Sequence, residues 1–324
     1  MQLQTAILLM TLLLVPAAGT ARAENAVTAS YLYNLSDFTG VVPINWAGIA
    51  VDETVNEVYV INGSVVKIFN DSGMEIYTFN DGGELGSIVD AATDGRGDIF
   101  AIVYNPRTYA YEIIRCNYRG EDPSRIALRD LPAAFAGFSP DRIVYRGESL
   151  YLASLNAMKM IVTDRTGLFK EGHDLAALLG FDETKRSNTG MVGFSVDGGG
   201  NVLFTIGVTA KAYVLSPDRK IRSFGERGSG KGKFGVPGGI VADPTGSYLF
   251  VADTLRCIVL VFDRDLHFIM DFGGRGDTPG TLIGPMALAM DKANRLYVTQ
   301  LAQRGISVYQ ISLATPQSAA QTAP

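Results

Sequence analysis

Histidine and cysteine, the side chains that most often bind metals or act as nucleophiles, are scarce in this sequence. The 324 residues include two His and two Cys. A catalytic zinc site needs about three protein ligands converging on one point. His173 and His267 fall in segments that we expect to lie far apart, so they do not complete such a site. We therefore expect neither a bound metal nor another cofactor.

A glycine-rich segment imitates a phosphate-binding loop. Gly225–Lys231 reads GERGSGK and matches the GxxxxGK pattern, but Gly232 stands where Ser or Thr would hold Mg²⁺. The residues that follow, KFGVPGG, do not begin the helix whose N-terminus would bind the phosphate. Similar glycine spacing recurs at Gly273–Gly280. This recurrence favours a connector between repeated units.

Five aspartates form a second candidate set of ligands. They occupy the same place in a recurring segment, where one strand turns into the next: Asp52, Asp94, Asp197, Asp243 and Asp291. Asp side chains accept hydrogen bonds from turn N–H groups. A repeated unit also spreads its members around a rim instead of bringing them together. We therefore expect these aspartates to be structural.

The elements that position these residues belong to a repeat with six copies. Each copy is a short apolar strand, a turn and a strand with an aromatic centre, as in GIAVDETVNEVYV at Gly48–Val60. The copy at Arg142–Ser154 lacks the Asp. The aromatic centres are Tyr59, Phe100, Tyr151, Phe204, Phe250 and Tyr297. They are 41 to 53 residues apart, which is the length of a four-stranded propeller blade.

The repeats predict an all-β fold, a six-bladed β-propeller of four-stranded antiparallel blades. The last copy ends after its third strand, near Ile311, while a strand-like segment, Ser30–Leu35, precedes the first copy. An unpaired sheet edge promotes aggregation. We therefore expect Ser30–Leu35 to join the last blade and close the ring.

The strands nearest the axis predict a hub with little chemistry. They are mostly small or apolar, and Asp90 is their only carboxylate. We expect these strands at Trp46–Val51, Ile88–Thr93, Ile143–Tyr145, Met191–Val196, Gly239–Ala242 and Met286–Met290. The chain also lacks a nucleophile-elbow pattern. Cys116 and Cys257 fall in opposite blades, too far apart for a disulfide. These features favour binding over catalysis.

The two C-terminal repeats share a detailed pattern. Phe224–Asp253 reads FGERGSGKGKFGVPGGIVADPTGSYLFVAD, with a glycine-rich lead-in, Phe before Pro-x-Gly and a Val-Ala-Asp ending, and Phe272–Gln300 repeats the pattern. These features resemble the NHL family. Arg256, Cys257 and Ile258 stand where the family usually has Asn-His-Arg. The resemblance implies an NHL-type propeller. That family includes sensors, protein- and RNA-binding scaffolds and a few enzymes, so the fold does not decide the function.

The N-terminus has the features of an export signal. The apolar run Ala6–Val15 is too short to span a bilayer and is followed by Pro16 and an Ala21-Arg22-Ala23 cleavage pattern. We expect residues 1–23 to be a signal peptide, residues 24–313 the propeller and residues 314–324 a disordered tail. The mature protein would be periplasmic or extracellular with no membrane span. An uncleaved N-terminal anchor is the alternative.

The predicted partner is a protein or an extracellular polymer. The formal charge of −5 does not suggest nucleic acid, although a basic run between Arg219 and Lys233 leaves that alternative open. Links between blades emerge on one face, where they mix charged and apolar residues. Those that exceed the minimum length are expected to be loops at Gly120–Ser139, Leu168–Gly190, Gly225–Val236 and Gly273–Pro285. The candidate partner-binding residues are Phe138, Phe181, Arg227, Lys231, Lys233, Phe234, Arg275 and Asp277. We expect a non-catalytic scaffold or sensor. A metal-dependent lactonase- or lyase-like hydrolase that uses the central channel is the alternative.

Overall fold

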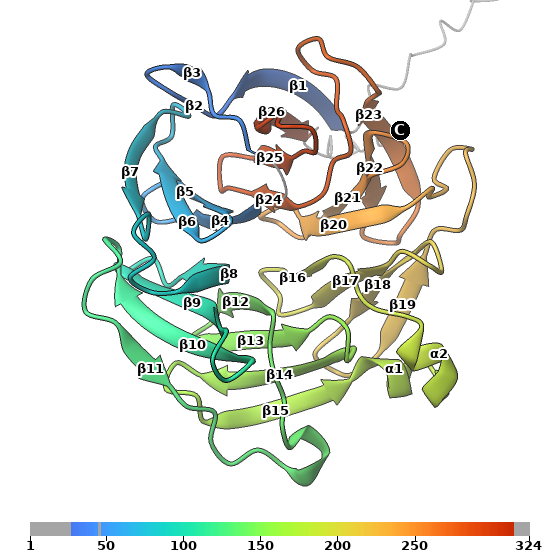
Figure 1. Cartoon of the computed structure of the whole chain (residues 1–324). Helices are drawn as coiled ribbons and strands as arrows, with labels where there is room; N and C mark the ends of the chain where they lie inside the picture. The colour runs from blue at the N-terminus through green and yellow to red at the C-terminus, as the bar shows by residue number, and fades with distance from the viewer. Residues whose placement is uncertain (1–26, 45–46, 314–324) are drawn as a thin grey trace, which may run out of the picture.

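The chain forms a ring of six blades around a central axis (Figure 1). The computed structural model describes residues 27–44 and 47–313. Each blade is a four-stranded antiparallel sheet, and the innermost strands of neighbouring blades contact one another around the hub. The predicted fold class is confirmed. The predicted signal peptide and the tail from residue 314 lie outside the described residues, as does Trp46, which we expected to begin the first inner strand.

The strands follow the chain from the hub outward in blades one to five. Blades one and two consist of β4 (Gly48–Asp52), β5 (Glu57–Asn62), β6 (Val65–Phe69) and β7 (Glu75–Phe79), then β8 (Ser87–Thr93), β9 (Asp98–Asn105), β10 (Ala110–Asn117) and β11 (Ser124–Ile126). Blades three and four consist of β12 (Arg142–Arg146), β13 (Ser149–Ser154), β14 (Lys159–Asp164) and β15 (Phe169–Asp174), then β16 (Phe194–Val196), β17 (Val202–Ile206), β18 (Lys211–Leu215) and β19 (Ile221–Phe224). Blade five consists of β20 (Pro237–Ala242), β21 (Tyr248–Asp253), β22 (Ile258–Asp263) and β23 (Phe268–Gly273).

Blade six closes the ring with strands from both ends of the chain. It consists of β24 (Leu288–Met290), β25 (Arg295–Thr299), β26 (Ile306–Leu313) and β1 (Val27–Asn34). The outermost strand, β1, runs antiparallel to β26, with Val27 opposite Leu313. The strand predicted at Ser30–Leu35 therefore has the predicted position and begins three residues earlier. A small hairpin of β2 (Ser36–Asp37) and β3 (Gly40–Val41) follows it.

The core lies between the blades. Buried side chains form six clusters, each shared by two neighbouring blades. For example, Ile61 of β5 packs in one cluster with Ile99 of β9. The aromatic centre of each repeat lies on the second strand, and all except Tyr151 are at most 2% exposed. The repeat is therefore the pattern of a blade that is buried on both faces.

The five repeat aspartates are structural, as predicted. Each carboxylate accepts hydrogen bonds from backbone N–H groups of its own turn. Asp243, for instance, accepts from Tyr248 N at 2.6 Å and from Thr245 N at 3.0 Å. Blade three lacks this Asp because its turn is shorter. Gly147 and Glu148 have φ of 55° and 58°, which forms a two-residue hairpin that needs no side-chain acceptor.

Two segments that we expected to be long loops contain outer strands. Gly120–Ser139 contains β11 and a 3₁₀ turn, η1 (Ala133–Phe135), while Leu168–Gly190 contains β15, α1 (Leu175–Leu178) and α2 (Glu183–Ser187). The residues of β11 and β15 are half-buried or exposed, so their sequences are mixed and give a weak signal. The short helix α1 begins after Asp174, whose carboxylate caps it by accepting from Ala177 N at 2.9 Å. Within residues 27–44 and 47–313, no helix is long or apolar enough to cross a membrane.

Candidate functional site

Antiparallel chain direction gives the ring two different faces. Links between blades and turns between second and third strands begin at one end of the strands, which we call the loop-rich face. Turns between first and second strands, including the five aspartate turns, lie at the opposite end.

The predicted partner-binding residues all lie in links between blades, but they are spread around the ring. Phe138 precedes blade three and packs against the core under that link. Phe181 precedes blade four and has Lys185 Nζ 3.9 Å from its ring centroid. Arg275 and Asp277 precede blade six and are exposed. The remaining four, Arg227, Lys231, Lys233 and Phe234, share the link into blade five.

Phe234 is a core residue. Its side chain is 0% exposed, and its ring centroid lies 6.2 Å from that of Phe224 and 5.6 Å from that of Phe262. The link folds back here, so that Phe234 N donates to Glu226 O at 2.8 Å. A Cβ at Gly225 would lie 2.1 Å from the Phe234 ring, so glycine is required for this packing. The prediction that Phe234 contacts a partner is therefore wrong.

Both glycine-rich segments are connectors of the same design. In one, the backbones of Arg227 and Phe234 form an isolated parallel β-bridge. In the other, the backbones of Arg275 and Leu282 form the same bridge, and Leu282 is also 0% exposed. The buried Asp253 carboxylate holds the first connector by accepting from Gly235 N at 2.6 Å and Val236 N at 3.1 Å. This contact explains the Val-Ala-Asp ending of the repeat without any ligand.

Exposed apolar side chains accompany Arg227 at the junction of blades four and five. Val208, Val236 and Leu255 are 60%, 37% and 67% exposed and come from two turns and one link. A Cβ at Gly207, beside Val208, would lie 3.9 Å from Val236 Cγ1, and one at Gly235, beside Val236, would lie 3.2 Å from Leu255 Cδ2. Arg227 Nη2 donates to Val208 O at 2.9 Å. We call Val208, Arg227, Val236 and Leu255 the blade four–five patch.

Sequence reasoning found Arg227 but missed the three apolar members of this patch. Each is a single apolar residue in a short turn or link, which leaves no periodic signal. The basic residues between Arg219 and Lys233 do not form one continuous surface with the patch. Lys220 pairs with Asp218 at 2.7 Å in the turn before β19, on the opposite face, whereas Lys233 pairs with Glu226 at 2.9 Å.

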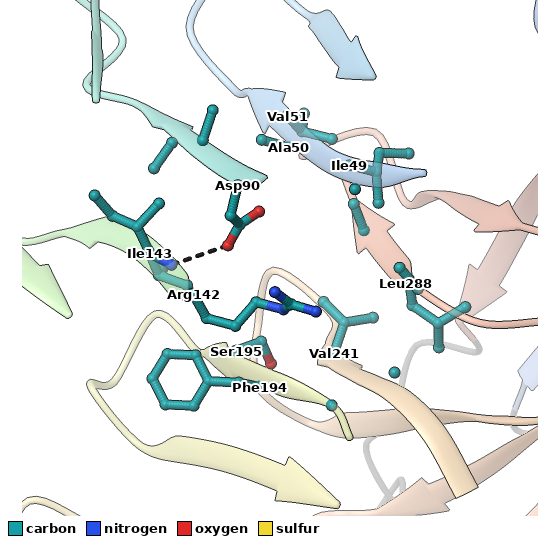
Figure 2. A pocket seen from close by; sticks show the side chains of 18 of the residues that line it. Ile49, Ala50, Val51, Asp90, Arg142, Ile143, Phe194, Ser195, Val241 and Leu288 are labelled. Carbon is teal, nitrogen blue, oxygen red and sulfur yellow. Dashed lines mark hydrogen bonds between the residues drawn. The ribbon is translucent and has the colours of Figure 1, made fainter. Parts of the chain in front are cut away.

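A second candidate site is a cavity of about 380 Å³ at the hub. The first strands of all six blades line it, from Val192 and Met286 at the loop-rich end to Glu53 and Arg146 at the other. Asp90 projects from β8 into it, and Oδ2 accepts from Ile143 N at 2.9 Å (Figure 2). Burial raises the pKa of Asp90 to about 6, and the nearby charge of Arg142 opposes this rise.

Two arginines at the hub were missing from the sequence-based description of the inner strands. The expected strand at Ile143–Tyr145 is longer in the structure and includes Arg142 and Arg146 at its ends. Arg142 extends into the cavity (Figure 2), and Arg146 Nη1 pairs with Glu53 Oε1 at 3.2 Å. The signal was present, because the same repeat copy begins with Arg142. The hub is therefore apolar with a few charges, and it is richer in charge than we expected.

Groups suited to metal or thiol chemistry are not gathered in the described ranges. Among residues 27–44 and 47–313, no group of three or more His, Cys, Asp or Glu side chains is arranged to hold a metal ion. Cys116 and Cys257 are both buried and free, so the predicted lack of a disulfide is confirmed. Burial raises the pKa of the Cys116 thiol to about 11, which keeps it protonated and unreactive at neutral pH.

Comparison with known proteins supports the propeller fold. No protein-family profile matches the sequence, and no curated protein matches it. A structural genomics protein of unknown function from Bacteroides thetaiotaomicron superposes with a TM-score of 0.62 at 15% identity, over 88% of this chain and 76% of that one. Virginiamycin B lyase from Staphylococcus aureus gives 0.57 at 12% identity, over 89% and 100%. Hydrazine synthase from Kuenenia stuttgartiensis gives 0.54 at 13%, over 82% and 84%. At these identities the likeness concerns the fold alone, and the NHL relationship remains a resemblance.

Proposed function

We propose that this chain is an exported, non-catalytic binding propeller that contacts another protein through its loop-rich face. The blade four–five patch is the observation that carries this proposal. It joins three exposed apolar side chains to one exposed guanidinium, a composition typical of the centre of a protein interface. Patches of this kind on soluble proteins commonly mark interaction sites.

The rest of the molecule supports binding in preference to catalysis. The polar groups of the repeats are used in turns and connectors, as Asp243 and Asp253 show. Two carboxylates line the hub cavity within the described residues. Asp90 is held by a backbone N–H group, and Glu53 is paired with Arg146. No specific observation favours the metal-dependent hydrolase, so it is not carried further.

The test is partner recovery with variants of the patch. The mature protein would be crosslinked in the envelope fraction of its native cells, with Val208→Asp/Leu255→Asp compared with the parent. We expect recovery of the specific partner to fall roughly tenfold or more, because two charges would enter an apolar contact. Val55→Asp is the matched control, since Val55 is 57% exposed in a turn on the opposite face.

Two outcomes would contradict the proposal. Equal recovery with the patch variant and the parent would remove the patch from the interface. Loss of recovery with Val55→Asp alone would move the interface to the opposite face. Thermal melts of all variants would show that the fold is intact, because the substituted side chains are exposed and contribute little to stability.

A further inference from the structure

The hub cavity holds two opposite charges that are not paired with each other. Asp90 of blade two and Arg142 of blade three both line it. Within the described residues, no contact of 4.0 Å or less joins the two charged groups. Both residues are partly buried, so each charged group has lost part of its hydration, which costs free energy unless a partner replaces the water. A separated pair beside a cavity therefore suggests that a ligand completes it.

Both groups have hydrogen-bonding capacity to spare. A guanidinium has five N–H donors, and in the described structure the bond formed by Arg142 is from Nη1 to Asp141 O at 2.6 Å. Figure 2 shows its guanidinium in the cavity near Ser195 and Val241. Asp90 Oδ2 is bonded to Ile143 N, whereas Oδ1 faces Gly48, where a Cβ would lie 3.6 Å away. Glycine at this position places no side chain beside Oδ1.

Apolar side chains form the wall beside the charged pair, while Glu53 and Arg146 pair with each other at the far end of the cavity. Ile49, Val241 and Leu288 surround the charged pair from three other blades (Figure 2). Such a wall lowers the local dielectric, which strengthens any ion pair formed inside. It also provides a surface for an apolar substituent. The volume of about 380 Å³ lies within the range of small-molecule pockets, about 300–1,000 Å³.

We infer that the hub cavity binds a small zwitterion with an apolar substituent, of which an aliphatic or aromatic α-amino acid is the simplest. Its carboxylate accepts hydrogen bonds from Arg142, its ammonium group donates to Asp90, and its side chain packs on Ile49, Val241 and Leu288. A simple anion would bring a negative charge close to Asp90, and a simple cation would bring a positive charge close to Arg142. The zwitterion satisfies both groups and leaves the hub neutral. This site is separate from the blade four–five patch.

The test compares ligands that differ by one charge. Isothermal titration calorimetry of the full mature chain at pH 7.5 would use L-leucine and L-phenylalanine. The single-charge analogues are 4-methylpentanoate, which lacks the ammonium group, and L-leucinamide, which lacks the carboxylate. The corresponding analogues of phenylalanine are 3-phenylpropanoate and L-phenylalaninamide. We expect one of the two amino acids to bind and its own two analogues to bind at least about tenfold more weakly, because each analogue loses a charge-assisted hydrogen bond.

Matched variants locate the site. Arg142→Gln and Asp90→Asn should each weaken amino-acid binding about tenfold or more, while Arg264→Gln, the same change in an exposed turn, should leave it unchanged. Circular dichroism would show that each variant is folded. The inference is overturned if neither amino acid binds, if a single-charge analogue binds equally well, or if affinity survives Arg142→Gln.

Discussion

Asp90 is a carboxylate whose surroundings at the hub differ from those in the unfolded chain. Its carboxylate loses water at the hub, accepts one backbone hydrogen bond from Ile143, and gains partial compensation from Arg142. Desolvation is the largest of these effects, so the pKa rises from 3.8 to about 6. The folded protein therefore binds the Asp90 proton more tightly than the unfolded chain does.

This difference predicts a pH dependence of stability. Between about pH 4 and pH 6 the unfolded state has already lost the proton, so the contribution of Asp90 to the unfolding free energy falls as pH rises. The shift corresponds to about 2–3 kcal/mol. Asp90→Asn cannot ionise, so its stability relative to the parent should be higher at pH 7.5 than at pH 4 by about that amount. Urea unfolding at both pH values measures it. Asp265→Asn, in an exposed turn, is the control, and an equal Asp90→Asn effect at both pH values would disprove the argument.

At the scale of the element, the connectors show how glycine and one apolar side chain cooperate. In the link into blade five, Gly225 allows the chain to fold over Phe234, and Gly273 does the same for Leu282 in the next link. Charged residues of these links remain exposed to solvent. Lys231, for example, is exposed, whereas the Phe234 ring in the same link is fully buried. The connectors therefore extend the core between neighbouring blades.

The buried position of Phe234 predicts a large loss of stability on truncation. Phe234→Ala removes contacts with Phe224 and Phe262 and leaves a cavity, which should reduce the unfolding free energy by about 3–5 kcal/mol. Lys231→Ala in the same link should change it by less than about 0.5 kcal/mol. Chemical denaturation of both variants gives the comparison. A similar, small loss of unfolding free energy for both variants would mean that the Phe234 side chain is not packed as described.

At the scale of the whole molecule, one N-terminal strand holds the ring closed. β1 supplies the outer edge of blade six, and Val27, which is fully buried, packs in the cluster shared by blades five and six. Without β1, the backbone groups of β26 would face solvent along a strand of eight residues. Residues at the two ends of the chain therefore stabilise each other directly.

Removal of β1 should destabilise the ring as a unit. A chain that begins at Leu35 would expose the β26 edge, so we expect the melting temperature to fall by roughly 10 °C or more, with concentration-dependent aggregation. The reference is a chain that begins at Glu24, the predicted mature N-terminus. Calorimetry and size-exclusion chromatography measure the two effects. An unchanged melting temperature would show that closure does not depend on this strand.

The sequence by itself determined the features that depend on neighbouring residues along the chain. The aromatic repeat predicted the blades, and the Asp turns followed from local hydrogen bonding. The missing fourth strand of blade six was predicted from the unpaired edge near Ile311. Tertiary structure alone decided the candidate sites. The ring brings Asp90 and Arg142 from different blades to one cavity, turns Phe234 inward, and joins Val208 to Leu255. These arrangements depend on packing between blades, which no local pattern records.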